Sequence, residues 1–320
     1  MEIIRTENLS KSYGAILAVD RVNLSIQEGE IMALLGPNGA GKTTTLMILS
    51  TLLKPSSGMA RVNGFDVRSR PDRVRASIGM VFQDPSSDEL LTGWENLRLH
   101  ALMYDVPWPS IPDRISGVLK LVGLENRRNH LVKTYSGGMR RRLEIARGLL
   151  HEPRVLFLDE PTLGLDPQTR EHIWEYIETL ARDTGMTIVL TTHYMEEAER
   201  LCSRVAIIDH GAVVALDTPR ALCDAIGGDT ILIRGKQLAV DPIRKFPFVR
   251  ALETVEDGIR LSVTEAGAHL QAILQAAGPV ERVEVHPADL NDVFMYYTGK
   301  GIREGTGGVL EHIRSFARVR

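Results

Sequence analysis

The fold is decided by Gly36-Pro37-Asn38-Gly39-Ala40-Gly41-Lys42-Thr43-Thr44, a stretch that fits the phosphate-binding pattern G-x-x-x-x-G-K-[ST]. Its glycines allow backbone conformations that turn successive N–H groups inward around phosphate oxygens. Lys42 can reach the β- and γ-phosphates, and the hydroxyl of Thr43 can bind Mg²⁺. An apolar run at residues 31–35 predicts a buried strand before the loop, and residues 43–53 predict a helix after it. This order indicates that the chain binds a nucleoside triphosphate.

A second buried strand is predicted at residues 154–159, and it ends in two adjacent carboxylates, Asp159 and Glu160. In enzymes with a phosphate-binding loop, an acid at this strand end helps to hold Mg²⁺, which makes Asp159 a predicted metal residue beside Thr43. Side chains alternate along a strand, so Glu160 can address the water that attacks the γ-phosphate. A strand end with two solvated acids is the alternative when this run is considered by itself.

Between the loop and this strand lies a Ser-Gly-Gly turn within Tyr135-Ser136-Gly137-Gly138-Met139. Here the chain resembles ATP-binding-cassette (ABC) ATPases, whose defining motif Leu-Ser-Gly-Gly-Gln stands just before the carboxylate strand. Ser136, Gly137 and Gly138 keep the hydroxyl and the backbone N–H donors of that motif at a helix N-terminus. Tyr135 and Met139 depart from it, which leaves the role of the family's glutamine side chain open. The form Tyr-Ser-Gly-Gly-Met is similar to the drug-resistance (daunorubicin-type) branch of ABC exporter ATPases.

Four further positions match the family in their order along the chain. Tyr13 matches the aromatic residue that stacks on adenine, and Gln83 matches the glutamine that contacts Mg²⁺ and the attacking water. Gly164-Leu165-Asp166 matches the loop that crosses the dimer interface, and His193 matches the histidine that contacts the γ-phosphate. Considered singly, Tyr13 could be a surface aromatic residue, Gln83 a strand cap and His193 a structural histidine.

The resemblance therefore implies ATP and Mg²⁺ as cofactors. It implies three catalytic residues, which are Glu160, His193 and Gln83. It implies three metal residues, which are Thr43, Gln83 and Asp159. The nucleotide-binding residues that it implies are Tyr13, Gly36, Pro37, Asn38, Gly39, Ala40, Gly41, Lys42, Thr43, Thr44, Ser136, Gly137, Gly138 and Asp166.

Composition limits the class of protein. The chain has 320 residues, a net charge of −3 and an apolar share of 43%, which is typical of a soluble globular protein of about two domains. No stretch approaches the ~18 to 20 apolar residues of a membrane span, and the start lacks the layout of a signal peptide. Cys202 and Cys223 are predicted to be free thiols in a reducing compartment. The near-neutral charge argues against a nucleic-acid partner held by charge.

The predicted fold class is α/β, with an ABC-type ATPase domain at residues 1–222. The resemblance implies a mixed-sheet core, an antiparallel β subdomain and an α-helical subdomain at about residues 84–150. Residues 60–67 are a hairpin candidate with Asn63-Gly64 as its turn. A small α+β accessory domain is predicted at residues 223–299, either as a structural cap or as a ligand sensor. Residues 300–320 are predicted to be a flexible basic tail, in which residues 309–318 can form an amphipathic helix that lies on an anionic membrane.

The resemblance also implies a functional assembly. Two copies of the chain would sandwich two ATP molecules head to tail, with each phosphate loop facing the Ser136 turn of the other copy. A separately encoded transmembrane permease would hold the dimer at the cytoplasmic face of the cell membrane, and the transporter would export drug-like or lipid-like molecules. The ATPase of an ABC importer and a non-transport ABC ATPase acting on ribosomes or DNA are the alternatives. The cargo itself is not indicated, because cargo contacts belong to the permease.

Overall fold

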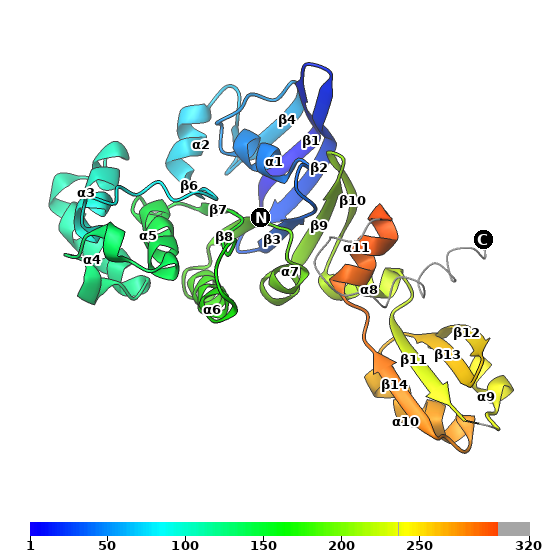
Figure 1. The fold of residues 1–320 in the computed structure, drawn as a ribbon. Helices are drawn as coiled ribbons and strands as arrows, with labels where there is room; N and C mark the ends of the chain where they lie inside the picture. The colour runs from blue at the N-terminus through cyan, green and yellow to red at the C-terminus, as the bar shows by residue number, and fades with distance from the viewer. Residues whose placement is uncertain (236, 300–320) are drawn as a thin grey trace. The chain divides into compact units, whose positions relative to one another are not determined.

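The computed structural model describes residues 1–235 and 237–299, and these divide into two compact units (Figure 1). The first unit is Met1–Leu216, and the second begins at Asp217 rather than at the predicted Cys223. The reason is that helix α8 (Pro219–Ala225) packs against α11 (Leu290–Thr298), so α8 belongs to the second unit. The basic tail predicted for residues 300–320, with its amphipathic segment, lies outside the described residues. Within the described ranges, no helix has the length and apolar character of a bilayer span.

An antiparallel sheet with the order β2-β1-β4-β5 forms one layer of the first unit. Its strands are β1 (Glu2–Tyr13), β2 (Ile16–Gln27), β4 (Ser57–Val62) and β5 (Phe65–Asp66). Asn63 and Gly64 join β4 to β5 with φ angles of 50° and 77°, which is the left-handed backbone that a tight hairpin turn needs. The predicted hairpin and the predicted antiparallel β subdomain are therefore confirmed.

A second sheet has the order β10-β9-β3-β8-β7-β6. Its strands are β3 (Ile31–Leu35), β6 (Ile78–Val81), β7 (Val155–Asp159), β8 (Thr187–Thr192), β9 (Arg204–Asp209) and β10 (Ala212–Asp217). The pairs from β6 through β7, β8 and β3 to β9 are all parallel. Leu35 pairs with Thr192, and Asp159 pairs with Thr191, so β3, β7 and β8 end side by side. Parallel strands present their C-terminal ends at one edge, where α/β proteins bind ligands.

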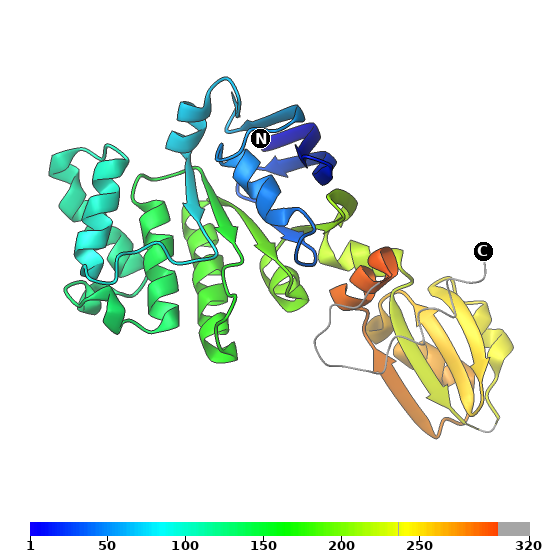
Figure 2. The ribbon, with the colours of Figure 1, turned by 45° about the horizontal axis from the view of Figure 1, so that its top comes forward.

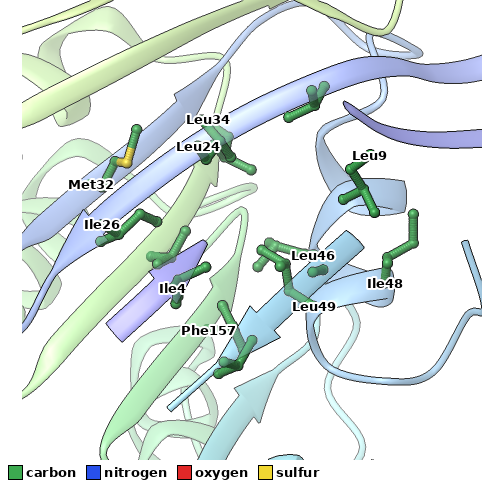
Figure 3. Packing of buried hydrophobic residues seen from close by; sticks show 14 of the residues in the cluster. Ile4, Leu9, Leu24, Ile26, Met32, Leu34, Leu46, Ile48, Leu49 and Phe157 are labelled. Carbon is green, nitrogen blue, oxygen red and sulfur yellow. The ribbon is translucent and has the colours of Figure 1, made fainter. Parts of the chain in front are cut away.

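Helix α1 (Lys42–Leu49) packs between the two sheets, in contact with β2 and β4 on one side and with β7 and β8 on the other. Figure 3 shows Leu46 and Leu49 of α1 beside Ile4 of β1 and Phe157 of β7. Each fully buried side chain of this kind stabilises the fold by about 1.5–3 kcal/mol. The predicted helix at residues 43–53 is too long, because the chain turns at Thr51, which has a φ of 67°.

Figures 1 and 2 show the other helices of the first unit beside the six-stranded sheet or in the helical subdomain. Helix α2 (Pro71–Ser77) leads into β6. Helices α5 (Gly137–Leu149), α6 (Pro167–Thr184) and α7 (Met195–Leu201) follow one another along the six-stranded sheet, with α5 against β6 and α7 against β3 and β8.

The helical subdomain predicted at about residues 84–150 contains α3 (Gly93–Met103), α4 (Ile111–Leu121) and α5, which pack on one another. Short 3₁₀ turns link them at Trp108–Ser110, Glu125–Arg127 and Val132–Thr134. Leu97, Ile115 and Leu143 of the three helices are fully buried in a common core, separate from the core around α1. The subdomain therefore has its own apolar core.

The second unit has an antiparallel sheet with the order β12-β13-β11-β14. Its strands are β11 (Asp229–Arg234), β12 (Val249–Val255), β13 (Gly258–Val263) and β14 (Arg282–His286). Helices α9 (Val240–Arg244) and α10 (Ala266–Ala277) complete it together with α8 and α11. Ile231, Leu261 and Ile273 lie in its buried core. This arrangement confirms the predicted α+β domain.

Candidate functional site

The loop after β3 has two glycines that no other residue can replace without a clash. A Cβ atom on Gly36 would lie 2.3 Å from the carbonyl oxygen of Ile208, and one on Gly41 would lie 2.3 Å from that of Ala18. Gly41 also has a φ of 103°, which is open to glycine and strained for other residues. The loop is therefore pressed against its neighbours, and its backbone leads directly into the N-terminus of α1. A helix N-terminus with free N–H groups is a site for anions.

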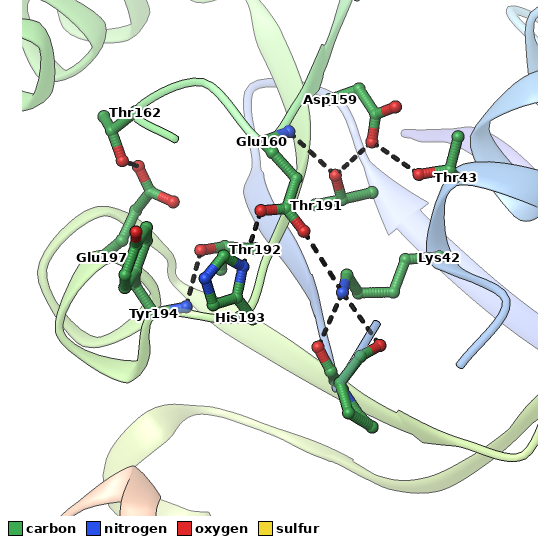
Figure 4. Close-up of polar contacts among 12 residues, drawn as sticks. Lys42, Thr43, Asp159, Glu160, Thr162, Thr191, Thr192, His193, Tyr194 and Glu197 are labelled. Atoms are coloured by element: carbon green, nitrogen blue, oxygen red, sulfur yellow. Dashed lines mark hydrogen bonds and ion pairs between the residues drawn. The ribbon is translucent and has the colours of Figure 1, made fainter. Parts of the chain in front are cut away.

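Lys42 is buried beneath this loop (Figure 4). Its Nζ donates to the carbonyl oxygens of Gly36 at 2.7 Å and Pro37 at 3.1 Å, and it lies 3.3 Å from Oε1 of Glu160. Burial lowers the pKa of Lys42, and the nearby Glu160 carboxylate only partly opposes this effect. The ammonium is held close to the place where the loop N–H groups would meet a phosphate.

Glu160 is a buried carboxylate between two nitrogen groups, at the end of β7 (Figure 4). Its Oε1 faces Lys42, and its Oε2 lies 2.6 Å from Nδ1 of His193. Burial raises the pKa of Glu160, but the His193 hydrogen bond and the Lys42 charge outweigh burial, so the net pKa is lowered. The backbone of Glu160 is left-handed, with a φ of 48°, and its N–H donates to the carbonyl oxygen and the hydroxyl of Thr191. The carboxylate is thus held in one place and kept ionised.

Asp159 points to the other side of the strand end, toward α1 (Figure 4). Its Oδ1 accepts hydrogen bonds from the hydroxyls of Thr43 at 3.0 Å and Thr191 at 2.5 Å. Carboxylate and hydroxyl oxygens suit Mg²⁺, which usually takes one or two protein carboxylates and completes its shell with phosphates and water. No group of three or more His, Cys, Asp or Glu side chains that could hold a metal by themselves occurs among the described residues. The oxygen pair therefore fits Mg²⁺ that arrives with a nucleotide.

The Ser136 turn begins α5. Ser136 is the N-cap of this helix, and its hydroxyl accepts the N–H of Met139 at 3.3 Å. A Cβ atom on Gly138 would lie 2.4 Å from Cγ2 of Thr169, which places this turn against the start of α6. Tyr135 is buried and donates its hydroxyl to the carbonyl oxygen of Arg127, and Met139 packs on the same helical core. Both departures from the family motif are thus accounted for by packing within the helical subdomain.

Comparisons with known proteins agree with this geometry. Residues 19–163 match the family model described as ABC transporter. The chain is 45% identical over 231 residues to the daunorubicin/doxorubicin resistance ATP-binding protein DrrA of Streptomyces peucetius, covering 72% of this chain and 70% of that protein. It is 36% identical to the linearmycin resistance ATP-binding protein LnrL of Bacillus subtilis, covering 94% of this chain and 100% of that protein. The chain belongs to the ATP-binding subunits of ABC transporters.

Two further comparisons extend this result. The Nod factor export ATP-binding protein I of Cupriavidus metallidurans is 40% identical to this ABC subunit, with coverage of 94% and 99%. A solved dimeric ATP-binding cassette in a post-hydrolysis state with ADP and Pi has a TM-score of 0.61 at 31% identity, covering 68% of this chain and 98% of that one. Subunits of this family bind and hydrolyse ATP, and they work as dimers with a separate transmembrane subunit. The predicted family, fold and ATPase activity are confirmed.

The other predicted site residues of the ABC subunit lie outside the cluster around Glu160. Tyr13 is 46% exposed at the end of β1, with the ammonium of Lys11 5.2 Å from its ring centre. Asp166 is exposed and caps α6 by accepting the N–H and the hydroxyl of Thr169. Gln83 is exposed after β6, and no hydrogen bond between described residues joins it to Thr43 or Asp159. The structure thus gives Asp166 a capping contact and leaves the Gln83 side chain facing solvent.

Three residues of the site were not predicted from the sequence of the ABC subunit. Thr191 bonds both Asp159 and the Glu160 backbone, and it could have been suspected as a polar residue at the end of an apolar strand. Glu197 is fully buried and accepts from Thr162 and from the indole of Trp174, and burial raises its pKa. Arg141 lies in a run of three arginines, which gives no hint that its side chain is the buried one.

Proposed function

We propose that this ABC subunit uses Glu160 as the base of ATP hydrolysis and powers the export of drug-like or lipid-like molecules through a separate permease. The observation that carries the catalytic part is the position of the Glu160 carboxylate, held between Lys42 and His193 and next to the Asp159–Thr43 pair. The export direction is supported by the relatives, whose names refer to daunorubicin and linearmycin resistance and to Nod factor export.

The residues of the site divide the chemical work. Thr43 and Asp159 would hold Mg²⁺, with Gln83 as a further ligand once its exposed side chain turns inward. The ion supplies charge that offsets the negative charge of the phosphates. Lys42 lies within reach of both the loop and Glu160, so a γ-phosphate competes with Glu160 for its ammonium. Glu160 then accepts a proton from the attacking water, and His193 holds the carboxylate in place.

The nucleotide site is proposed to be shared between two copies of the chain. Ser136 and Gly137 are exposed at the N-terminus of α5, and within the described ranges no hydrogen bond joins them to the loop at residues 36–44. Free N–H groups at a helix N-terminus attract anions. A second copy arranged head to tail would bring its Ser136 turn to the phosphates held by the loop of the first copy. Asp166 and Tyr13 would lie at the edges of the same nucleotide. The similarity to dimeric cassettes supports this arrangement.

The permease is proposed to dock on α3 and the segment before it, which places the subunit at the cytoplasmic face of the cell membrane. This surface exposes four large apolar side chains, and they are Leu90, Leu99, Leu102 and Met103. Their exposed fractions run from 39% to 73%, which is unusual for apolar residues gathered within one short segment. An apolar surface next to charged residues suits an amphipathic helix of the permease.

Transport into inside-out membrane vesicles tests this proposal. With its permease and Mg²⁺-ATP, the native subunit is expected to drive uptake of daunorubicin, used as a fluorescent drug-like probe. Leu99→Asp in the exposed surface of α3 should lower uptake by about tenfold or more while basal ATP hydrolysis continues. Val285→Asp, at an exposed position of β14, is the matched control and should transport like the native protein. ATP-driven loss of daunorubicin from the vesicles would indicate import, and native uptake by Leu99→Asp would place the docking surface elsewhere.

A pH dependence follows from the lowered pKa of Glu160. Glu160 must be ionised to accept a proton, so activity should fall only as the pH drops through this lowered pKa. Because the His193 hydrogen bond lowers the pKa, His193→Ala should move the acid limb of the kcat/KM profile to higher pH, in addition to slowing the reaction. His193→Gln, which offers an N–H donor again, should move the limb partly back. An acid limb at the same pH in all three proteins would show that His193 does not act on the base.

A further inference from the structure

Arg141 is a buried arginine of α5 whose guanidinium contacts three separate segments of the first unit. Its Nε donates to the carbonyl oxygen of Pro161 at 2.7 Å, and its Nη1 donates to that of Phe82 at 2.5 Å. Its Nη2 donates to the carbonyl oxygen of Asp159 at 2.9 Å. The residue is only 6% exposed. One side chain therefore joins α5 to the segment after β6, to the end of β7 and to the loop that follows β7.

Two of these carbonyls border Glu160, since Asp159 precedes it and Pro161 follows it. Glu160 is also the residue with a φ of 48°, a backbone conformation that a residue with a side chain keeps only when its surroundings hold it. Thr191 holds its N–H from the side of β8, and Arg141 holds the two neighbouring carbonyls from the side of α5. The contacts of Arg141 are therefore placed where they can keep this strained backbone in position.

The chemistry explains why arginine suits this place. A guanidinium presents five N–H donors in a flat, fixed fork, so it can serve carbonyls that lie in different directions at the same time. Lysine carries its donors on a single nitrogen atom. Burial lowers the pKa of Arg141, while the carboxylates of Glu144, Glu197 and Asp159 oppose this effect, and a guanidinium stays protonated at neutral pH. The three bonds are therefore charge-assisted, which makes them stronger than bonds between neutral groups.

The same helix begins at Ser136, the turn that the proposed function places on the nucleotide of the second copy. We propose that Arg141 is a positioning residue, which fixes the backbone of Glu160 for hydrolysis and couples it to the Ser136 end of α5. This inference rests on the proposed function for its second half. A movement of the turn toward a nucleotide carries Arg141 with it, because both lie in the first turns of one helix. The carbonyls on either side of Glu160 then move as well, so the base in one copy responds to the nucleotide across the interface.

Kinetics of Arg141→Gln and Arg141→Lys test the role of this side chain. Arg142→Gln is the matched control, because Arg142 is the next residue and donates to the carbonyl oxygen of Val122 inside the helical subdomain. Arg141→Gln should lower kcat by about 10- to 100-fold with little change in KM for ATP, since misplacing a reacting group by about 1 Å costs that much. Its Hill coefficient for ATP should fall toward one. Arg141→Lys, which keeps the charge and loses the fork, should lie between native and Arg141→Gln, and Arg142→Gln should keep the native Hill coefficient.

Hydrogen exchange without nucleotide separates this inference from the proposed function. Arg141→Gln should speed exchange of the Glu160 amide, and Arg142→Gln should leave it unchanged. This measurement needs neither hydrolysis nor a dimer, so it tests the positioning role of Arg141 by itself. Failure of the native protein to dimerise with ATP would count against the proposed function and would leave this test valid. If Arg141→Gln does not fold, Arg141→Lys carries both measurements. Native kcat in the folded variant, or native exchange at Glu160, would overturn the inference.

Discussion

Replacing Glu160 by glutamine is expected to remove most ATP turnover while ATP binding is kept. Glutamine has nearly the same shape and still offers an oxygen to Lys42, but it cannot take a proton from water. Loss of a well-placed base typically lowers the rate by about 10² to 10⁴. The loop, Lys42 and the Thr43–Asp159 pair are untouched by this change, so the groups proposed to hold the phosphates and Mg²⁺ stay in place.

Phosphate release at saturating ATP measures this effect, and binding of a fluorescent ATP analogue reports the affinity separately. Glu152→Gln is the matched control, because the side chain of Glu152 is 74% exposed and pairs with Arg114 on the surface. That variant should hydrolyse ATP at the native rate, since an exposed ion pair contributes little. Glu160→Gln that turned over ATP as fast as native protein would remove Glu160 from the mechanism.

Local patterns were enough to predict much of this site from the sequence. The loop with Lys42 and Thr43 and the paired acids Asp159 and Glu160 each stand at the end of an apolar run that forms a buried strand. Parallel strands end at a common edge, so the sequence order alone brings these groups together. His193 joins them for the same reason, because it follows β8.

Contacts between segments that lie far apart in the chain could not be predicted from local sequence patterns. The bonds of Thr191 to Asp159 and of Arg141 to the carbonyl oxygen of Phe82 join residues far apart in the chain, and no local periodicity encodes them. The end of α1 was missed because residues 43–53 contain no Gly or Pro to mark a helix end, while Thr51 takes a left-handed backbone with a φ of 67°. The predicted start of the second unit, Cys223, lies after the observed start at Asp217. The sequence of α8 looks like a continuation of the first unit, because its packing partner α11 comes much later in the chain.

ATP is expected to convert the Glu160→Gln protein from a monomer into a dimer. ATP would make its full set of contacts only in the closed dimer, where it touches the loop of one copy and the Ser136 turn of the other. Hydrolysis would normally remove this bridge. A ligand must bind one state about 10⁴-fold more tightly than the other to shift an equilibrium from 1:99 to 99:1. Blocking hydrolysis keeps the bridge in place, so the dimer should accumulate. Lys42→Ala in the same background should stay monomeric, because it removes the charge that meets the phosphates.

The most direct test of the proposed shared site is the mass of Glu160→Gln in dilute solution by analytical ultracentrifugation, with Mg²⁺-ATP, with Mg²⁺-ADP and without nucleotide. The account predicts a monomer without nucleotide and with ADP, and a dimer with ATP. A monomer at saturating ATP, or the same dimer under all three conditions, would contradict it.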